Sequence, residues 1–121
     1  NDCPTLYHSF YSIVTDWQYF QKLASTAIFK LTLPTGIKVV PFMFNKERCT
    51  GYRYDQHIMS PYNKAAQELD EMIKSGVAKK HPIEVKWTGN NAIIIDNWHG
   101  IHSRGVAENG PGRKLYRLYI D

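Results

Sequence analysis

The residues best suited to chemistry lie near the carboxy-terminal end of the chain. A short apolar run ends at Asp96, and the histidines His99 and His102 follow at once. Arg113 and Arg117 come after a loop that contains glycine and proline. Neutral imidazole is a standard ligand for iron, zinc and copper, and a planar guanidinium suits a carboxylate. Polar groups gathered at the end of a buried strand therefore indicate a small-molecule site.

The two histidines are not equivalent as metal ligands. His99 and His102 are three residues apart, a spacing that brings side chains onto one face in a helix. A turn after a strand does not give this arrangement, so we do not expect both to ligate one metal. Lone histidines also pack or cap more often than they bind metal. Packing therefore stays open as the alternative for His102 on spacing alone.

Asp55 and His57 form a second candidate group. They stand two residues apart in a tyrosine-rich segment, 51–58, which we predict to be a strand, so their side chains would share a face. With His99 or His102 they could form a metal site of a different kind. Asp55 could instead bind a cationic group of a substrate, or simply face water as polar strand residues often do.

Most of the elements expected to position these residues are strands. Alternating apolar and polar residues predict strands over 27–33 and 37–44, and Pro41 within the second marks a strand edge or bulge. Other strands are predicted over 51–58, 82–87, 92–96 and 114–120. Several short strands separated by turns favour a mainly β fold, a sandwich or jelly roll.

Two helices are predicted to flank these strands. A capping box opens at Thr15, and apolar residues then recur at helical spacing over 15–25. Ser60, followed by proline, is predicted to cap a second helix, and Gly76 to end it. The apolar stripe of this second helix is predicted to face the core.

Composition limits the class of protein. A length of 121 residues with 43% hydrophobic and 21% charged residues fits a single ordered domain. No apolar run approaches the roughly 20 residues that span a membrane, and the net charge of +4 is scattered, so neither a membrane nor a nucleic acid is an expected partner. Cys3 and Cys49 make no disulfide framework, which predicts free thiols in the cytoplasm.

The carboxy-terminal motif resembles that of the iron(II)/2-oxoglutarate-dependent oxygenases of the taurine dioxygenase and clavaminate synthase group. These enzymes have an Asp-Asn pair, then a distal metal-binding histidine in a His-Gly-Arg-like triplet, then arginines on the next strand. Here Asp96-Asn97 and His102-Ser103-Arg104 take those places. The resemblance implies that His102 binds the metal, that Arg113 binds the distal carboxylate of 2-oxoglutarate, and that Arg117 lies beside the substrate.

Two upstream segments extend the resemblance. Residues 3–10 resemble the family segment Gly-Gly-x-Thr, although the glycines are absent, and Thr5 is implied to help bind 2-oxoglutarate. Residues 53–59 resemble the Arg-x-Asp/Asn-x-x-x-Met stretch of the clavaminate and amino-acid hydroxylase branch. That match makes Asp55 a candidate partner for a cationic group of the substrate.

One part of the family pattern is absent. The iron of these enzymes is held by two histidines and one carboxylate, and a His-x-Asp/Glu motif supplies the first two ligands. None of the five histidines here begins such a motif, which in the family lies upstream of the position matched by Thr5. We therefore expect residues 1–121 to be the carboxy-terminal part of one taurine dioxygenase-like catalytic domain. An amino-terminal fragment or second chain would complete its jelly roll, or double-stranded β-helix; loss of the metal site is the alternative.

The resemblance implies an oxidoreductase that needs Fe(II), 2-oxoglutarate and molecular oxygen. Its substrate would be a small polar molecule, such as an amino acid or a derivative, which it hydroxylates or otherwise oxidises. Two other classes stay open. One is a non-catalytic β-sandwich binding module, in which His102 packs and Arg113 is a surface charge. The other is a different metalloenzyme that uses Asp55 and His57.

Overall fold

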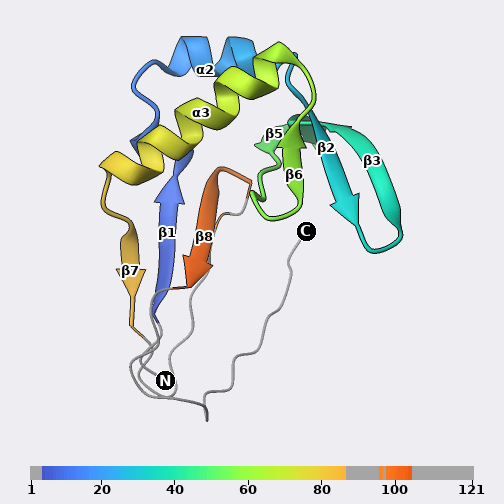
Figure 1. Ribbon diagram of the computed structural model, residues 1–121. Helices are drawn as coiled ribbons and strands as arrows, with labels where there is room; N and C mark the ends of the chain where they lie inside the picture. The colour runs from blue at the N-terminus through green and yellow to red at the C-terminus, as the bar shows by residue number, and fades with distance from the viewer. Residues whose placement is uncertain (1–3, 87–95, 97, 105–121) are drawn as a thin grey trace.

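The computed structural model describes residues 4–86, 96 and 98–104, with the backbone alone described for residues 102–104. These residues form three small antiparallel sheets beside a group of helices (Figure 1). The first sheet has the order β7 (Ile83–Val85), β1 (Thr5–Ser9), β8 (Gly100–Arg104). The second has the order β3 (Gly36–Pro41), β2 (Ile28–Leu33), β6 (Met59–Pro61), and the third pairs β4 (Met43–Lys46) with β5 (Cys49–Tyr52).

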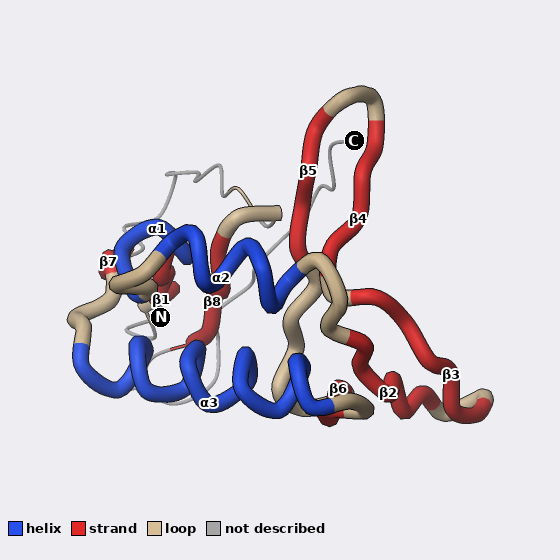
Figure 2. The backbone as a smooth tube through the Cα atoms, turned by 90° about the horizontal axis from the view of Figure 1, so that it is seen from above, coloured by secondary structure: helices blue, strands red, loops and turns tan. Residues whose placement is uncertain are grey.

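The helices lie together at one end of the strands. They are α1 (Phe10–Ile13), α2 (Trp17–Ala24) and α3 (Lys64–Lys79). Seen from above, α2 and α3 run side by side, and the β2–β3 and β4–β5 hairpins project from this layer in different directions (Figure 2). The prediction of a mainly β chain with flanking helices is confirmed, and none of the sheets among the described residues closes into a barrel. None of the described helices is long and apolar enough to cross a membrane.

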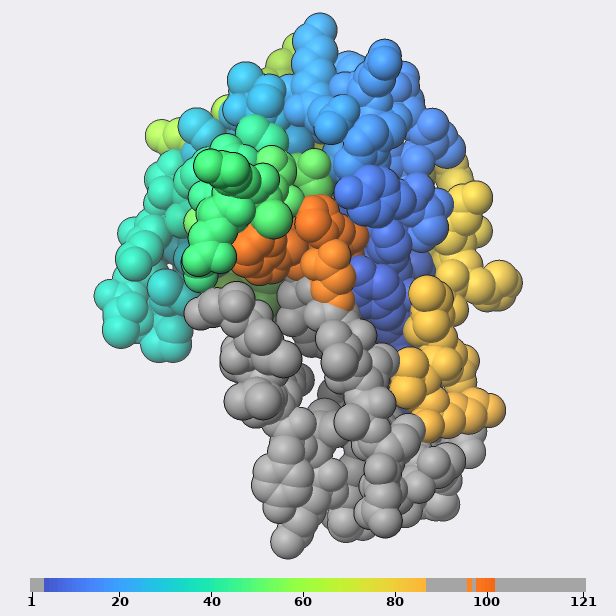
Figure 3. Space-filling view, turned by 180° about the vertical axis from the view of Figure 1, so that it is seen from behind, coloured from blue at the N-terminus to red at the C-terminus, as the bar shows by residue number. Residues whose placement is uncertain are grey.

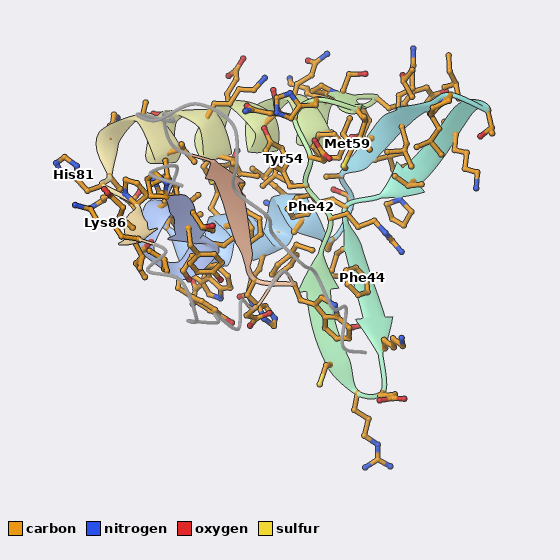
Figure 4. All side chains as sticks on the ribbon, turned by 90° about the horizontal axis from the view of Figure 1, so that it is seen from below. Phe42, Phe44, Tyr54, Met59, His81 and Lys86 are labelled. Carbon is orange, nitrogen blue, oxygen red and sulfur yellow. The ribbon has the colours of Figure 1, made fainter. Side chains whose placement is uncertain are left out.

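The core is built chiefly from aromatic rings. Phe10 packs against Phe20 and Tyr52, with ring centroids 5.6 and 5.8 Å apart, and Phe42 lies 5.4 Å from Tyr52. These side chains come from α1, from α2, from the bend between β3 and β4, which holds Phe42, and from the end of β5, which holds Tyr52. Phe42 lies in the interior, whereas Phe44 lies out on the β4–β5 hairpin (Figure 4). The fully buried side chains of the core are Phe10, Phe20, Phe29, Phe42, Leu69 and Ile73.

The start of α3 differs from the prediction. Ser60 does not cap it, because residues 59–61 pair with β2 as an edge strand, where a proline without an N–H is tolerated. Asn63 is the N-cap instead: its side-chain oxygen accepts from the N–H of Ala66 at 3.0 Å and from that of Ile28 at 3.1 Å. One amide thus both starts the helix and joins it to β2.

The predicted end of α3 at Gly76 is also wrong. The helix continues to Lys79, and Gly76 is buried within it. A Cβ atom there would lie 2.4 Å from the carbonyl oxygen of Ile13. Glycine at this position therefore allows α3 to approach the end of α1 closely, and it does not mark a helix terminus.

The other predicted elements agree in part. The helix predicted over 15–25 is confirmed as α2, although its N-cap is Asp16 and not Thr15, and α1 was not predicted. The strand over 27–33 is confirmed as β2, and Pro41 does interrupt the strand over 37–44, which divides into β3 and β4. β7 confirms the strand predicted over 82–87. The strands predicted over 92–96 and 114–120 lie outside the described residues, apart from Asp96.

Candidate functional site

Strands β1 and β8 come from opposite ends of the chain and pair with one another. The register places Thr5 opposite Arg104, Tyr7 opposite His102 and Ser9 opposite Gly100. Thr5 and His102 are therefore diagonal neighbours on adjacent strands, with Cα atoms about 7–8 Å apart. In the space-filling view, the segment that enters β8 (orange) lies against the amino-terminal part of the chain, which contains β1 (blue; Figure 3). The structure thus brings together two positions that the sequence singled out separately.

Thr5 and Tyr7 lie on one face of β1 because strand residues two apart share a face. Thr5 is buried. The Tyr7 hydroxyl donates a hydrogen bond of 2.9 Å to the carbonyl oxygen of Asp96, just before β8. Burial, and secondarily the Asp96 charge, raise the pKa of Tyr7, so its phenol keeps the proton that it donates.

Gly100 makes room for the Tyr7 ring. A Cβ atom on Gly100 would lie 2.2 Å from the Tyr7 hydroxyl oxygen and 2.3 Å from the ring carbon that carries it. Only glycine therefore lets the Tyr7 ring lie across the first residue of β8. Tyr7 and Gly100 together set how closely β8 approaches β1.

Asp96 and His99 close a tight turn before β8. The Asp96 carboxylate accepts from the Trp98 N–H at 3.0 Å and lies 2.7 Å from Nδ1 of His99. Nε2 of His99 donates to the carbonyl oxygen of Thr50, also at 2.7 Å. Both ring nitrogens lie within hydrogen-bond distance of oxygen atoms. Both ring nitrogens of His99 are therefore already engaged, and it could ligate a metal only by giving up one of these bonds.

This turn also connects three other parts of the molecule. The Tyr52 N–H donates to the carbonyl oxygen of Trp98, and the Phe10 N–H donates to that of His99, both at 2.9 Å. The Trp98 ring lies 5.1 Å from that of Phe44. The chain entering β8 is therefore held by β1, by the start of α1 and by the β4–β5 hairpin at once.

Asp55 and His57 do not form the predicted pair on a strand. The strand expected over 51–58 ends at Tyr52, and the residues that follow form a loop and a turn. The Asp55 carboxylate accepts from the N–H of His57 at 2.9 Å, and its carbonyl oxygen accepts from the N–H of Met59, also at 2.9 Å. An aspartate that caps its own turn in this way competes with strand pairing, which is why the strand prediction fails here.

The predicted metal ligands are only partly within the described residues. Those residues contain no group of three or more His, Cys, Asp or Glu side chains that could hold a metal ion, so Asp55, His57 and His99 do not assemble into one. The backbone of His102 is described in β8, but its side chain is not, and Arg113 and Arg117 lie outside the described part.

The buried His8 has a structural role. Its Nε2 lies 3.1 Å from the carbonyl oxygen of Lys80, the residue that caps α3. A nitrogen that faces a carbonyl oxygen carries a proton, so His8 donates this bond and connects β1 to the end of the helix.

Cys49 is the one cysteine among the described residues, and its thiol is exposed and forms no disulfide there.

Tyr7, Gly100 and the Asp96–His99 contact are the site features that sequence reasoning missed. The Tyr7–Asp96 hydrogen bond spans 89 positions of the sequence, so no local pattern could reveal it. The Asp-x-x-His spacing is a local signal, since short polar side chains commonly bond within turns. Comparisons of the chain with protein-family models, with curated proteins and with solved structures found no match.

Proposed function

We propose that this chain is the 2-oxoglutarate-binding half of an iron(II)-dependent oxygenase that hydroxylates or otherwise oxidises a small polar substrate. The observation that carries the proposal is the β1–β8 pairing, which sets the Thr5 and His102 positions diagonally on neighbouring strands. Thr5 and His102 are the positions that the family resemblance marks for the cosubstrate and the metal. Open sheets are what an incomplete jelly roll would contain, and an amino-terminal fragment or second chain would complete it.

His102 and the completing polypeptide would share the binding of iron. His102 would be one iron ligand, and the completing polypeptide would supply the histidine and carboxylate of the His-x-Asp/Glu motif. Bound iron would activate molecular oxygen with 2-oxoglutarate as the co-reductant. Of the three iron ligands of the family, this chain would therefore supply one.

The chain's own residues would bind and orient the organic ligands. The Thr5 hydroxyl would donate a hydrogen bond to 2-oxoglutarate from its buried position at the start of β1. Tyr7, on the same face, would close that side of the site, because its phenol is fixed to Asp96 and its ring covers Gly100. The Arg113 guanidinium would pair with the distal carboxylate of 2-oxoglutarate through two parallel hydrogen bonds.

Arg117 and Asp55 would bind the substrate. Residues four apart on a strand share a face, so Arg117 would follow Arg113 along the same side of its strand. Asp55 is exposed, and all its described hydrogen bonds lie within its own turn, so its carboxylate is accessible to a cationic group such as an amine. An amino acid or derivative is the substrate class that suits both charges. The exposed, free thiol of Cys49 fits a reducing, cytoplasmic setting.

Isothermal titration of 2-oxoglutarate into the iron-loaded, complete enzyme, with oxygen excluded, tests the cosubstrate assignment. Arg113→Ala removes a charge-assisted contact worth roughly 2–4 kcal/mol, which corresponds to a dissociation constant about 30- to 1,000-fold higher. Arg113→Lys should restore only part of the affinity, because a point charge cannot replace the planar fork. Arg117→Ala should weaken binding of the substrate more than that of 2-oxoglutarate.

Arg48 provides the matched control for that titration. It lies in the turn at the tip of the β4–β5 hairpin and is exposed, so Arg48→Ala changes the net charge equally without touching the proposed site. The affinity for 2-oxoglutarate should be unchanged. If Arg113→Ala binds 2-oxoglutarate as the parent does, or if both variants lose the same affinity, the cosubstrate assignment fails.

A further inference from the structure

The outer edge of β3 carries an inference that does not depend on the oxygenase proposal. β3 pairs with β2 along its whole length, from Pro41 opposite Ile28 to Gly36 opposite Leu33. Within the described part of the chain, no strand pairs with the other edge of β3. The β2–β3 hairpin extends away from the helices (Figures 1 and 2). A strand edge of this kind presents backbone N–H and C=O groups to a further strand.

The side chains on this edge are apolar and exposed. Ile37 is 65% exposed and Val39 53% exposed, and the two lie on one face of β3 because they are two residues apart. Lys30 is opposite Val39 on β2, so it borders the same face. An edge strand with exposed apolar side chains is a ready template for pairing with another chain. Ile37 and Val39 therefore indicate a surface that another strand covers.

The charge around this edge is of one sign. Residues 28–41, which form β2, its turn and β3, contain Lys30 and Lys38 and no acidic residue. Lys38 lies between Ile37 and Val39, and its side chain points to the opposite face of β3. Lys30 and Lys38 are exposed, and neither forms an ion pair with another described residue. Acidic side chains would complement both.

We propose that the outer edge of β3 binds an extended acidic peptide of a partner protein by β-strand addition. Backbone hydrogen bonds would supply affinity, and alternate side chains of the peptide would supply specificity. The peptide would place apolar residues beside Ile37 and Val39 and an acidic residue beside Lys38. The pattern that fits is a short alternation of β-branched and acidic residues.

Two other strands would match this edge less well. If the β3 strand of a second copy paired with this edge, the charged residues that it brings would all be lysines, and like charges across a strand pair are destabilising. Residues 113–117 of this chain, which contain Arg113, Lys114 and Arg117, would also add only positive charge. Charge complementarity therefore favours an acidic strand from another protein.

Fluorescence anisotropy with the full 121-residue chain tests the proposal. One labelled probe is an eight-residue peptide that alternates valine with glutamate, and the other alternates valine with lysine. The glutamate peptide should bind at least about tenfold more tightly than the lysine peptide. Lys38→Glu should reverse that preference. Val39→Thr keeps the strand propensity but removes exposed apolar surface. It should weaken binding of the glutamate peptide several-fold.

Lys22→Glu is the matched control, because Lys22 is exposed on α2 and the substitution changes the net charge equally. It should leave the peptide preference as it is. Equal binding of both peptides, absence of binding, or the same effect of Lys22→Glu and Lys38→Glu would overturn the proposal. So would concentration-dependent self-association of the chain that Val39→Thr abolishes, which would identify a second copy as the occupant. Binding to vesicles with 30% anionic lipid, but not to the peptide, would assign the edge to a membrane surface instead.

Discussion

The β2–β3 hairpin and the β1–β8 pair are both antiparallel, but they are built in different ways. β2 and β3 are joined directly by the turn at Pro34 and Thr35, so the pairing is local. β1 and β8 come from opposite ends of the described chain, and β1 also pairs with β7. β3 leaves apolar side chains exposed, whereas β1 has a strand on each side.

The β1–β8 pair is held in place by several other parts of the molecule, whereas the outer edge of β3 is open within the described chain. The segment entering β8 is held by hydrogen bonds from Tyr7, Phe10, Tyr52 and His99. Positions that must hold a ligand within a fraction of an ångström need such support. The β2–β3 hairpin is bonded to Asn63 and Ile58 from its β2 side and to Arg53 at Pro41, but within the described part of the chain no strand pairs with the outer edge of β3, which suits an edge that accepts another strand. We therefore propose chemistry at the β1–β8 pair and docking at β3.

The largest expected difference between the two regions is in the cost of removing an apolar side chain. Phe10 is fully buried and lies directly after β1, where its ring packs against those of Phe20, Phe42 and Tyr52. Phe10→Ala should lower the free energy of unfolding by about 3–5 kcal/mol. Ile37→Ala on the exposed face of β3 should change it by less than about 0.5 kcal/mol. Urea denaturation measures both, and similar losses would show that β3 is as buried as the start of α1.

Gly100→Ala tests the close approach of β1 and β8. The new methyl group would collide with the Tyr7 ring, and relieving the overlap should cost about 1–3 kcal/mol of stability. In a Tyr7→Leu background the collision partner is gone, so the same substitution should cost much less. A double-mutant cycle measures the coupling between the two positions. Additive effects would mean that Tyr7 does not lie over Gly100.

Tyr54→Phe tests the contact that joins the loop before β6 to α3. The Tyr54 hydroxyl donates a hydrogen bond of 2.6 Å to the buried Asp70 carboxylate, which also pairs with Lys74. Losing a bond to a charged group should cost about 1.5 kcal/mol.

The same contact should make stability depend on alkaline pH. Burial and the bond to Asp70 raise the pKa of Tyr54 far above its ordinary value of 10.0. The folded chain therefore retains a proton that the unfolded chain releases, so this contribution is complete below pH 10 and is lost as the pH rises above it. Unfolding free energies measured between pH 8 and 11 should fall more steeply for the parent than for Tyr54→Phe. Parallel curves would contradict the assignment.

The smallest expected effect belongs to the contact between the Asp96 carboxylate and His99. The Asp96 side chain is largely exposed, so Asp96→Asn should cost only about 0.2–1 kcal/mol, since the amide oxygen still accepts from Trp98. Salt at 1 M should remove most of that difference by screening. A loss above about 2 kcal/mol that salt does not change would show that the pair is effectively buried.

Local patterns in the sequence predicted the parts of the fold that local interactions build. The β2–β3 hairpin follows from alternation and a proline turn, and α2 from its apolar spacing. Asp55 shows where such reasoning failed, because a side-chain bond within the turn replaced the expected strand. Gly76 shows a second failure, because its reason lies in a contact with Ile13, far away in sequence. The candidate site has the same limit: the sequence singled out Thr5 and His102, but only the folded chain shows them on paired strands.

The most direct test of the central claim is iron(II) binding with 2-oxoglutarate present and oxygen excluded, measured by equilibrium dialysis. We predict that His102→Ala weakens the iron affinity of the enzyme, completed by its amino-terminal part, at least about tenfold. His57→Ala, the matched control in the exposed turn after Asp55, should bind iron as the parent does. Unchanged iron binding by His102→Ala, above all together with a loss in His57→Ala, would contradict a metal site on the β1–β8 pair.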